Sequence, residues 1–294
     1  MNKIGFIGVG IMGKSMVRNL MKAGFELHIY ARTKSKVEDV IGEGAQFHES
    51  IKDCVQDCDA VITIVGFPQD VEEVYFDEGN ILDSAKKGAY LIDMTTTSPQ
   101  IAEKIYAEGT KRGFHVMDAP VTGGDTGAKA GTLSILVGGE KEDYEACMPL
   151  FEAMGTNINY QGKAGCGQHC KLANQIMIAG TLSGVCEALT YAKEQGLDPE
   201  VFMKSVATGA AGSKQLDTFG PKILKDDYAP GFFMKHFIKD MKLALIEANR
   251  KGLSLDVLSM VLANYEELEQ EGYGDLGTQA LMKFYDEEHR NTEE

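Results

Sequence analysis

The stretch Lys3-Ile4-Gly5-Phe6-Ile7-Gly8-Val9-Gly10-Ile11-Met12-Gly13 decides the fold of this chain. Its first five residues form a short run rich in strand-forming types. From Ile11 to Ala23 the apolar residues recur at helical spacing, and Gly24 follows as a stop signal. Three glycines at G-x-G-x-x-G spacing therefore lie at the turn from a predicted strand into the first turn of a predicted helix.

This glycine pattern is weak alone but specific in a strand–turn–helix context, where it predicts a dinucleotide-binding site. Glycine permits the tight turn and the close approach of a pyrophosphate, and the helix N-terminus offers free N–H groups to it. A glycine-rich turn without a ligand is the alternative. The predicted cofactor-binding residues of this loop are Gly8, Gly10, Ile11, Met12 and Gly13.

The end of the second predicted strand bears on the choice of nucleotide. An Asp or Glu there usually binds the ribose hydroxyls of NAD, but the sequence Tyr30-Ala31-Arg32-Thr33-Lys34-Ser35-Lys36 contains no acid. Arg32 can pair with a 2′-phosphate and stack on adenine, and Thr33 can add a hydroxyl donor. We therefore expect NADP(H) to be favoured, with NAD(H) possible. The alternative is that these basic residues form only a solvated loop.

Strand and helix signals alternate through the first half of the chain, which predicts a parallel sheet with helices on both faces. From Gln168 onward no convincing strand is recognisable. We expect an α/β Rossmann-type NAD(P)-binding domain over residues 1–163 and an all-helical substrate and oligomerisation domain over 164–294. Further strands are expected at 26–30, 60–65, 89–93, 114–117 and 133–137, helices at 172–193, 199–207, 221–225, 237–251 and 256–270, and a frayed tail at 290–294.

Composition excludes several classes of partner. The chain has 294 residues and 33 glycines, and 29 basic against 44 acidic residues give a net charge of −15. Such a balance argues against unspecific nucleic-acid binding and against binding to an anionic membrane. No leader segment and no apolar run of about 18 residues is seen, so we expect a cytoplasmic protein.

The six cysteines do not predict a disulfide framework or a metal site. Cys166, His169 and Cys170 lie within about one helical turn, but no C-x-x-C pair occurs anywhere in the chain. We expect no metal, and we read these residues as small packing groups with one polar histidine.

Three further segments resemble motifs of the β-hydroxyacid dehydrogenases. Asp118-Ala119-Pro120-Val121-Thr122-Gly123-Gly124 resembles their D-x-P-V-S-G-G substrate motif. The segment from Gly162 to Asn174 resembles their G-x-x-G-x-G-x-x-x-K-x-x-N catalytic segment, and Lys239-Asp240 resembles their late K-D pair. The likeness covers nearly the whole chain. The family includes 3-hydroxyisobutyrate dehydrogenase, tartronate semialdehyde reductase and the glyoxylate/succinic semialdehyde reductases.

The resemblance implies a hydride transfer between a nicotinamide and a short 3-hydroxy acid or semialdehyde, in a cleft between the two domains. Such a reaction needs a group that exchanges a proton with the substrate oxygen. The family's pattern gives that role to Lys171, with Asn174 on the same helix face. It also implies a dimer or tetramer, which the small-residue stripe of the long helix favours.

The resemblance assigns the remaining site residues as well. Substrate binding falls to Thr122, Gly123 and Gly124, with Phe232 and Ser213 as further pocket residues; cofactor binding falls to Phe67, Pro68, Thr96, Lys239 and Asp240. Thr122 replaces the family's serine, so its extra methyl group narrows the pocket. The alternatives are a non-catalytic dinucleotide-binding scaffold and an imine reductase-like enzyme. Lys171 argues against both, because such relatives lose or replace the lysine.

Overall fold

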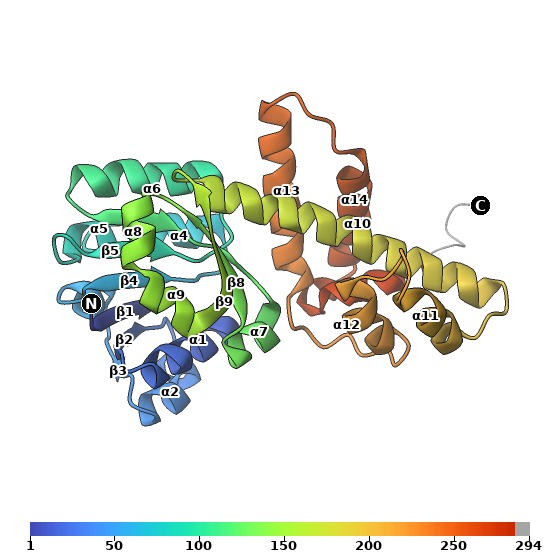
Figure 1. Cartoon of the computed structure of the whole chain (residues 1–294), viewed down its shortest axis with the longest axis horizontal. Coiled ribbons are helices and arrows are strands. Elements are labelled where there is room, and N and C mark those ends of the chain that lie inside the picture. Colours follow the sequence, from blue (N-terminus) through green and yellow to red (C-terminus); the bar gives the residue numbers. More distant parts are fainter. Residues whose placement is uncertain (286–294) are drawn as a thin grey trace. The chain divides into compact units, whose positions relative to one another are not determined.

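The computed structural model describes residues 1–285, which fall into two compact units, Met1–Lys171 and a second that begins at Leu172 (Figure 1). The first unit alternates strands and helices around one sheet. The second is built from helices. The expected order, a Rossmann-type α/β domain followed by an all-helical domain, is confirmed.

The first unit contains a single mixed sheet. Its strands run in the order β3-β2-β1-β4-β5-β6-β8-β7, with β9 on the other side of β8. The strands are β1 (Lys3–Ile7), β2 (Glu26–Tyr30), β3 (Gln46–Phe47), β4 (Ala60–Thr63), β5 (Tyr90–Asp93), β6 (His115–Asp118), β7 (Val121–Thr122), β8 (Leu133–Gly138) and β9 (Gly155–Gly162).

The expectation of a wholly parallel sheet is wrong at one edge. The six strands from β3 through β2, β1, β4 and β5 to β6 in sheet order are parallel. Strand β8, however, pairs antiparallel with both β6 and β7. Gly123 and Gly124, with φ of 132° and 64°, let the chain reverse after β7. An apolar run such as that of β8 predicts burial and not direction, so this reversal has no periodic signal.

Strand β9 was not expected from the sequence. It pairs parallel with β8, yet most of its side chains are exposed and polar. An edge strand of this kind lacks the apolar pattern on which strand prediction depends.

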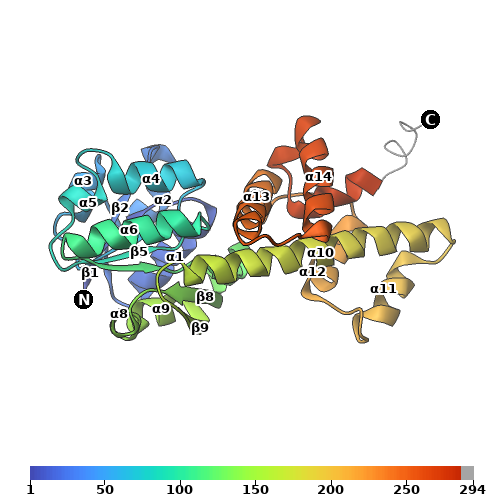
Figure 2. The same cartoon turned by 90° about the horizontal axis from the view of Figure 1, so that it is seen from above.

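The helices of the first unit cover both faces of the sheet, and Figure 2 shows α4 and α6 on the side opposite α8 and α9. One core cluster contains Met16 and Phe151, and the other contains Tyr75 and Ile105. The helices are α1 (Ile11–Lys22), α2 (Glu38–Gly42), α3 (Ile51–Val55), α4 (Pro68–Phe76), α5 (Ile81–Ser84), α6 (Pro99–Lys111), α7 (Gly124–Ala130), α8 (Lys141–Ala146) and α9 (Met148–Met154), with a short 3₁₀ turn η1 at Lys34–Lys36.

The second unit packs its helices around one core that includes Phe237 and Tyr265. Within residues 172–285 no strand is assigned, only an isolated bridge between Phe233 and Gly277. Its elements are α10 (Cys166–Glu194, which begins in the first unit), α11 (Pro199–Ala207), α12 (Lys214–Ile223), α13 (Met234–Arg250), α14 (Asp256–Gln270) and the 3₁₀ segments η2 (Tyr273–Asp275) and η3 (Thr278–Tyr285).

Three helix starts differ from the prediction. Helix α10 begins at Cys166, six residues before the predicted Leu172. Helix α12 begins at Lys214 and not at Pro221, because the Ser213 hydroxyl caps it by accepting from the Leu216 N–H at 3.1 Å. Pro221 lies inside this helix, although proline usually marks a helix start. Helix α13 begins three residues before the predicted Phe237. The predicted frayed tail at 290–294 lies outside the described residues.

Helix α10 has 29 residues and contains an 18-residue window with a mean hydropathy of 1.2, so by length and composition alone it could span a membrane. Core helices of soluble proteins pass the same test. Ala179, Leu182, Cys186 and Leu189 are buried in the core of the second unit. Burial in this core therefore accounts for part of its apolar character, since 44 % of the apolar window lies inside the protein.

Candidate active site

The glycine-rich loop between β1 and α1 contains two kinds of glycine. A Cβ on Gly8, whose φ is +98°, would lie 2.0 Å from the Ile64 carbonyl oxygen, and a Cβ on Gly13 would lie 2.2 Å from that of Gly8. Backbone packing therefore requires both. A Cβ on Gly10 would meet no described atom within 4 Å. The backbone at Gly10 is thus open to a ligand, as close approach of a pyrophosphate requires.

The start of α1 suits an anionic ligand. Its N-cap is Gly10, with no side-chain cap, and its first turn carries no acidic residue. Ile11 is exposed and Met12 is half-buried. The N–H groups at this helix start thus have no competing side-chain anion in the described helix, and the helix dipole favours negative charge there.

Arg32, just after β2, is held by an acidic residue that sequence analysis did not select. Its Nη1 lies 3.2 Å from Asp70 Oδ1, while 74 % of the side chain remains exposed. Asp70 also accepts the Phe67 N–H at 2.9 Å through Oδ2, which caps α4 at Pro68. A guanidinium has five N–H donors, so this pairing leaves donors for an anion. Thr33 is exposed at the start of η1.

Polar residues form a row where the central strands end. Thr63, Asp93, Asp118 and Gly138 are register partners across β4, β5, β6 and β8. The carboxyl edge of a parallel sheet is where α/β proteins bind ligands. Asp93 and Asp118 are both buried there.

Asp118 fastens the start of α10 to this edge. Its Oδ1 accepts the Gly165 N–H at 2.7 Å, and its Oδ2 accepts the Gln168 N–H at 2.8 Å. A Cβ on Gly167 would lie 2.3 Å from the Leu136 carbonyl oxygen, so the helix start and the sheet are in close contact. Gly167, within the segment from Gly162 to Asn174, thus serves this close approach.

Gln168, at the same helix start, forms hydrogen bonds to the loop that contains Thr95 and Thr97. Its side chain is fully buried; its Oε1 accepts the Thr97 N–H at 2.9 Å, and its Nε2 donates to the Thr95 carbonyl at 2.8 Å. These bonds hold the turn that contains the half-buried Thr96. Lys171 follows Gln168 by about one helical turn and is itself buried, with 7 % of its surface exposed.

Sequence analysis quoted Asp118 and Gln168 inside the motifs but gave them no role. Both are polar residues at the boundary of an element: Asp118 ends a buried strand, and Gln168 follows Gly167 at the start of a helix. That signal could have selected them. Their bonding partners, however, lie about 50 and 70 residues away along the chain.

Asp93 is an unusual acid at this edge. Complete burial raises its pKa to about 6, although the Thr95 N–H and the Thr63 hydroxyl donate to its Oδ1 at 3.1 and 2.7 Å. The neighbouring Asp118, whose pKa burial also raises, adds to this shift. Asp93 therefore changes its charge much closer to neutral pH than an ordinary aspartate.

The predicted substrate loop forms the turn between β7 and α7. Thr122 ends β7 and is half-buried. Gly123 and Gly124 both have positive φ, and Gly124 begins α7. Successive backbone N–H groups at such a turn can bind a carboxylate.

In the second unit, four predicted or neighbouring polar residues form a continuous chain. Asn174 Nδ2 donates to Gln175 Oε1 at 2.8 Å, and Gln175 Nε2 donates to Asp240 Oδ2 at 2.6 Å. Lys239 Nζ lies 2.8 Å from Asp240 Oδ1. Asn174 and the Lys239–Asp240 pair, separate in the sequence, are thus connected, and Gln175 is the residue that sequence analysis missed.

Two further predicted residues have local roles in the second unit. Phe232 packs edge-on against Phe237, with ring centroids 5.9 Å apart, at the margin of the core. Ser213 caps α12.

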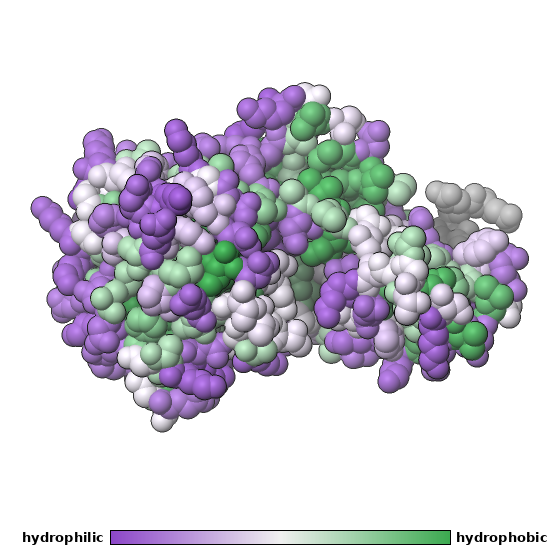
Figure 3. Space-filling model, in the orientation of Figure 1, coloured by the Kyte–Doolittle hydropathy of each residue, from purple (hydrophilic) through white to green (hydrophobic). Residues whose placement is uncertain are grey.

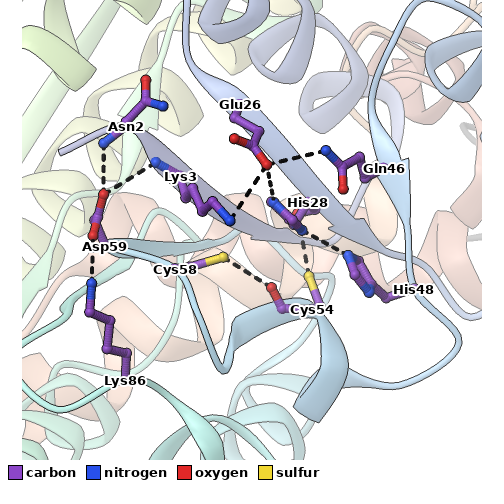
Figure 4. Close-up of polar contacts among 10 residues, drawn as sticks. All are labelled: Asn2, Lys3, Glu26, His28, Gln46, His48, Cys54, Cys58, Asp59 and Lys86. Carbon is purple, nitrogen blue, oxygen red and sulfur yellow. Dashed lines mark hydrogen bonds and ion pairs between the residues drawn. The ribbon is translucent and has the colours of Figure 1, made fainter.

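The cysteines are all free, and two of them, Cys54 and Cys58, are buried in the core cluster that contains Tyr75. Figure 4 shows Cys58 Sγ donating to the Cys54 carbonyl and Cys54 Sγ donating to the His28 carbonyl, at 3.1 and 3.3 Å (Figure 4). Burial raises the pKa of the Cys58 thiol to about 12. Among residues 1–285 no cluster of three or more His, Cys, Asp or Glu side chains could hold a metal ion.

Two protein families match the chain in consecutive segments. Residues 3–162 match the NAD-binding domain of 6-phosphogluconate dehydrogenase. Residues 165–285 match the NAD-binding domain of NADP-dependent 3-hydroxyisobutyrate dehydrogenase. The two matches together cover nearly all described residues.

Whole-chain relatives agree with these matches. An uncharacterised oxidoreductase of Bacillus subtilis, YkwC, is 49 % identical over 96 % of this chain and 98 % of its own. A probable mitochondrial 3-hydroxyisobutyrate dehydrogenase-like protein of Arabidopsis thaliana is 45 % identical over 95 % of this chain and 84 % of its own. The structure of 3-hydroxyisobutyrate dehydrogenase from Mycobacterium tuberculosis with L-serine is similar, with a TM-score of 0.89 at 27 % identity, and covers 97 % of this chain and 99 % of that one.

The glycine loop, the lysine-bearing helix start and the late Lys-Asp pair thus occur in a chain whose two segments match two parts of one enzyme family. The chain belongs to the 3-hydroxyisobutyrate dehydrogenase/β-hydroxyacid dehydrogenase family, and it is an NAD(P)-dependent oxidoreductase.

Proposed function

We propose that this enzyme transfers hydride between NADPH and a short carboxylate-bearing semialdehyde or its 3-hydroxy acid. Candidate substrates are 3-hydroxyisobutyrate, tartronate semialdehyde, succinic semialdehyde and glyoxylate. The observation that carries the proposal is the buried Lys171, one turn after the helix start that Asp118 and Gln168 hold at the carboxyl edge of the sheet.

Lys171 is the proposed proton donor and acceptor. The nicotinamide, when bound, supplies or accepts the hydride. In the reductive direction the Lys171 ammonium gives a proton to the carbonyl oxygen as that oxygen gains negative charge. Reduction uses the protonated form of Lys171 as the acid, whereas oxidation requires its neutral form as the base. Asn174, three residues on and on the same helix face, can bond the same oxygen.

The preference for NADPH rests on Arg32. Its exposed guanidinium can pair with a 2′-phosphate, and no acid stands at the end of β2 to bind a free ribose hydroxyl. The relative from Mycobacterium tuberculosis was solved with L-serine, a 3-hydroxy carboxylate. The Thr122 hydroxyl and the backbone N–H groups of Gly123 and Gly124 are the proposed carboxylate contacts here.

A substrate panel with both nicotinamides tests this proposal. Purified protein should oxidise NADPH with at least one short semialdehyde or glyoxylate, and kcat/KM should be higher with NADPH than with NADH. Arg32→Ala should lose that preference by raising KM for NADPH while leaving the KM for NADH nearly unchanged. Lys52→Ala, an exposed lysine on α3, is the control. Equal use of both nicotinamides by the parent enzyme would contradict the cofactor proposal.

A further inference from the structure

The chain of hydrogen bonds in the second unit has one direction, and an acidic group sets that direction. An ionised carboxylate can only accept hydrogen bonds. Gln175 lies 2.6 Å from Asp240 Oδ2, so it must present its Nε2 to that oxygen. Its Oε1 then faces the other way and accepts from Asn174 Nδ2 at 2.8 Å.

Burial raises the energetic cost of any other orientation of the Gln175 amide. Gln175 and Asp240 are each only 1 % exposed. Lys239 Nζ lies 2.8 Å from the other oxygen of Asp240, so this carboxylate faces an N–H donor at each of its two oxygens. Reversing the Gln175 amide would set its oxygen against a buried carboxylate, which is strongly unfavourable in a low-dielectric interior.

We propose that Gln175 is a positioning residue that orients the amide of Asn174 through its hydrogen bonds to Asn174 and Asp240. With one N–H committed to Gln175, Asn174 keeps its Oδ1 and its second N–H for a ligand. The Lys239–Asp240 pair thereby acts on Asn174 from 65 residues away in the sequence. This inference rests on the proposed function, in which Asn174 contacts the substrate oxygen.

A kinetic double-mutant cycle tests the coupling. Gln175→Leu preserves volume and removes both bonds, and it should lower kcat/KM for the semialdehyde about five- to tenfold, a typical coupling between directly bonded residues. The double variant Asn174→Ala/Gln175→Leu should be no worse than Asn174→Ala alone. Additive losses in an active enzyme would overturn the inference.

The structure offers a matched control for lost packing. Gln279 is also 1 % exposed in the second unit, and its Nε2 donates to the backbone carbonyls of Asp227 and Ala229. Gln279→Leu should lower the thermal midpoint without changing KM for the semialdehyde. In the same kinetic cycle, the changes in kcat/KM caused by Gln279→Leu and by Asn174→Ala should be additive. A Gln175→Leu variant that behaves in the same way would show a merely structural role and overturn the inference.

A conservative variant gives a second readout. In Gln175→Glu, a protonated carboxyl group can donate to Asp240 and accept from Asn174, as the amide does, but an ionised one cannot donate. Activity relative to the parent should therefore rise as pH falls from 8 to 6, while Gln175→Leu stays flat relative to the parent. A flat profile for Gln175→Glu would contradict the proposed direction of the chain.

Failure of the proposed function is distinguishable from failure of this inference. If the parent enzyme turns over none of the panel, the proposed function fails, and with it the role of Asn174. If the parent is active and the kinetic cycle is additive, only the role of Gln175 fails.

Discussion

Lys171 is the single residue on which the proposed chemistry depends most. It is buried near the start of α10, where a lysine without a role would usually extend into solvent. Positioned acids and bases contribute roughly 10²–10⁴-fold to rate. We expect Lys171→Ala to lower kcat by that range while NADPH still binds, measured by steady-state kinetics and by fluorescence titration of NADPH. Lys163→Ala, an exposed lysine in the preceding loop, serves as the control. Activity within about tenfold of the parent would show that another group moves the proton.

Asp93 predicts a pH dependence of stability. Its pKa is about 6 in the folded protein and lower in the unfolded chain, so the folded state takes up the proton first as pH falls. The contribution of Asp93 to the free energy of unfolding therefore rises as pH falls through 6, and levels off below the unfolded pKa. Relative to that of Asp93→Asn, the free energy of unfolding of the parent should increase by about 1 kcal/mol as the pH falls from about 7.5 to about 5. Urea denaturation measures this difference. A difference that does not vary with pH would mean that Asp93 titrates as an ordinary carboxyl.

At the scale of elements, different glycines of the β1–α1 turn serve packing and ligand binding. A Cβ on Gly10 meets open space, whereas a Cβ on Gly13 meets the Gly8 carbonyl. Gly10→Ala should therefore keep the parent's thermal midpoint to within a few degrees but weaken NADPH binding at least tenfold. Gly13→Ala should lower the thermal midpoint itself. Calorimetry with and without NADPH distinguishes the two, and unchanged NADPH affinity in Gly10→Ala would show that the pyrophosphate does not approach there.

At the scale of the whole molecule, exposed apolar side chains concentrate in the second unit. Ile246 on α13 and Val257 and Met260 on α14 are each about half exposed, and Figure 3 shows apolar residues over these two helices (Figure 3). Exposed apolar groups of this kind favour association. We propose that the enzyme forms a homodimer or homotetramer through α13 and α14.

Charged substitutions test this association. Val257→Glu combined with Met260→Glu should shift the protein to monomer in light scattering, because burying two like charges without a partner is strongly unfavourable. Val201→Glu, on α11, is the control, since this exposed valine belongs to another helix. An unchanged molar mass in the double variant would place the interface elsewhere.

Much of the nucleotide half could be predicted because its signals are local. The glycine spacing, the apolar run of β4 and the missing acid after β2 each depend on neighbours in the sequence, and the confirmed strands and helices of the first unit follow from them. The start of α12 could not be predicted from the sequence, because the Ser213 cap and the internal Pro221 gave conflicting local signals. The polar edge strand β9 gave no signal at all.

The sequence by itself determined the order of the two domains, the family and the loop that suits a dinucleotide, since short-range patterns of glycine, charge and hydrophobicity encode them. Only the tertiary structure decided that β8 runs antiparallel, that Asp118 and Gln168 hold the helix start that carries Lys171, and that Gln175 joins Asn174 to Asp240. The hydrogen bonds from Gln168 to Asp118, from Gln168 to Thr95 and from Gln175 to Asp240 join residues 50 to 73 positions apart. No spacing in the sequence records such a bond, because the folded backbone alone brings its donor and acceptor within 3 Å of each other.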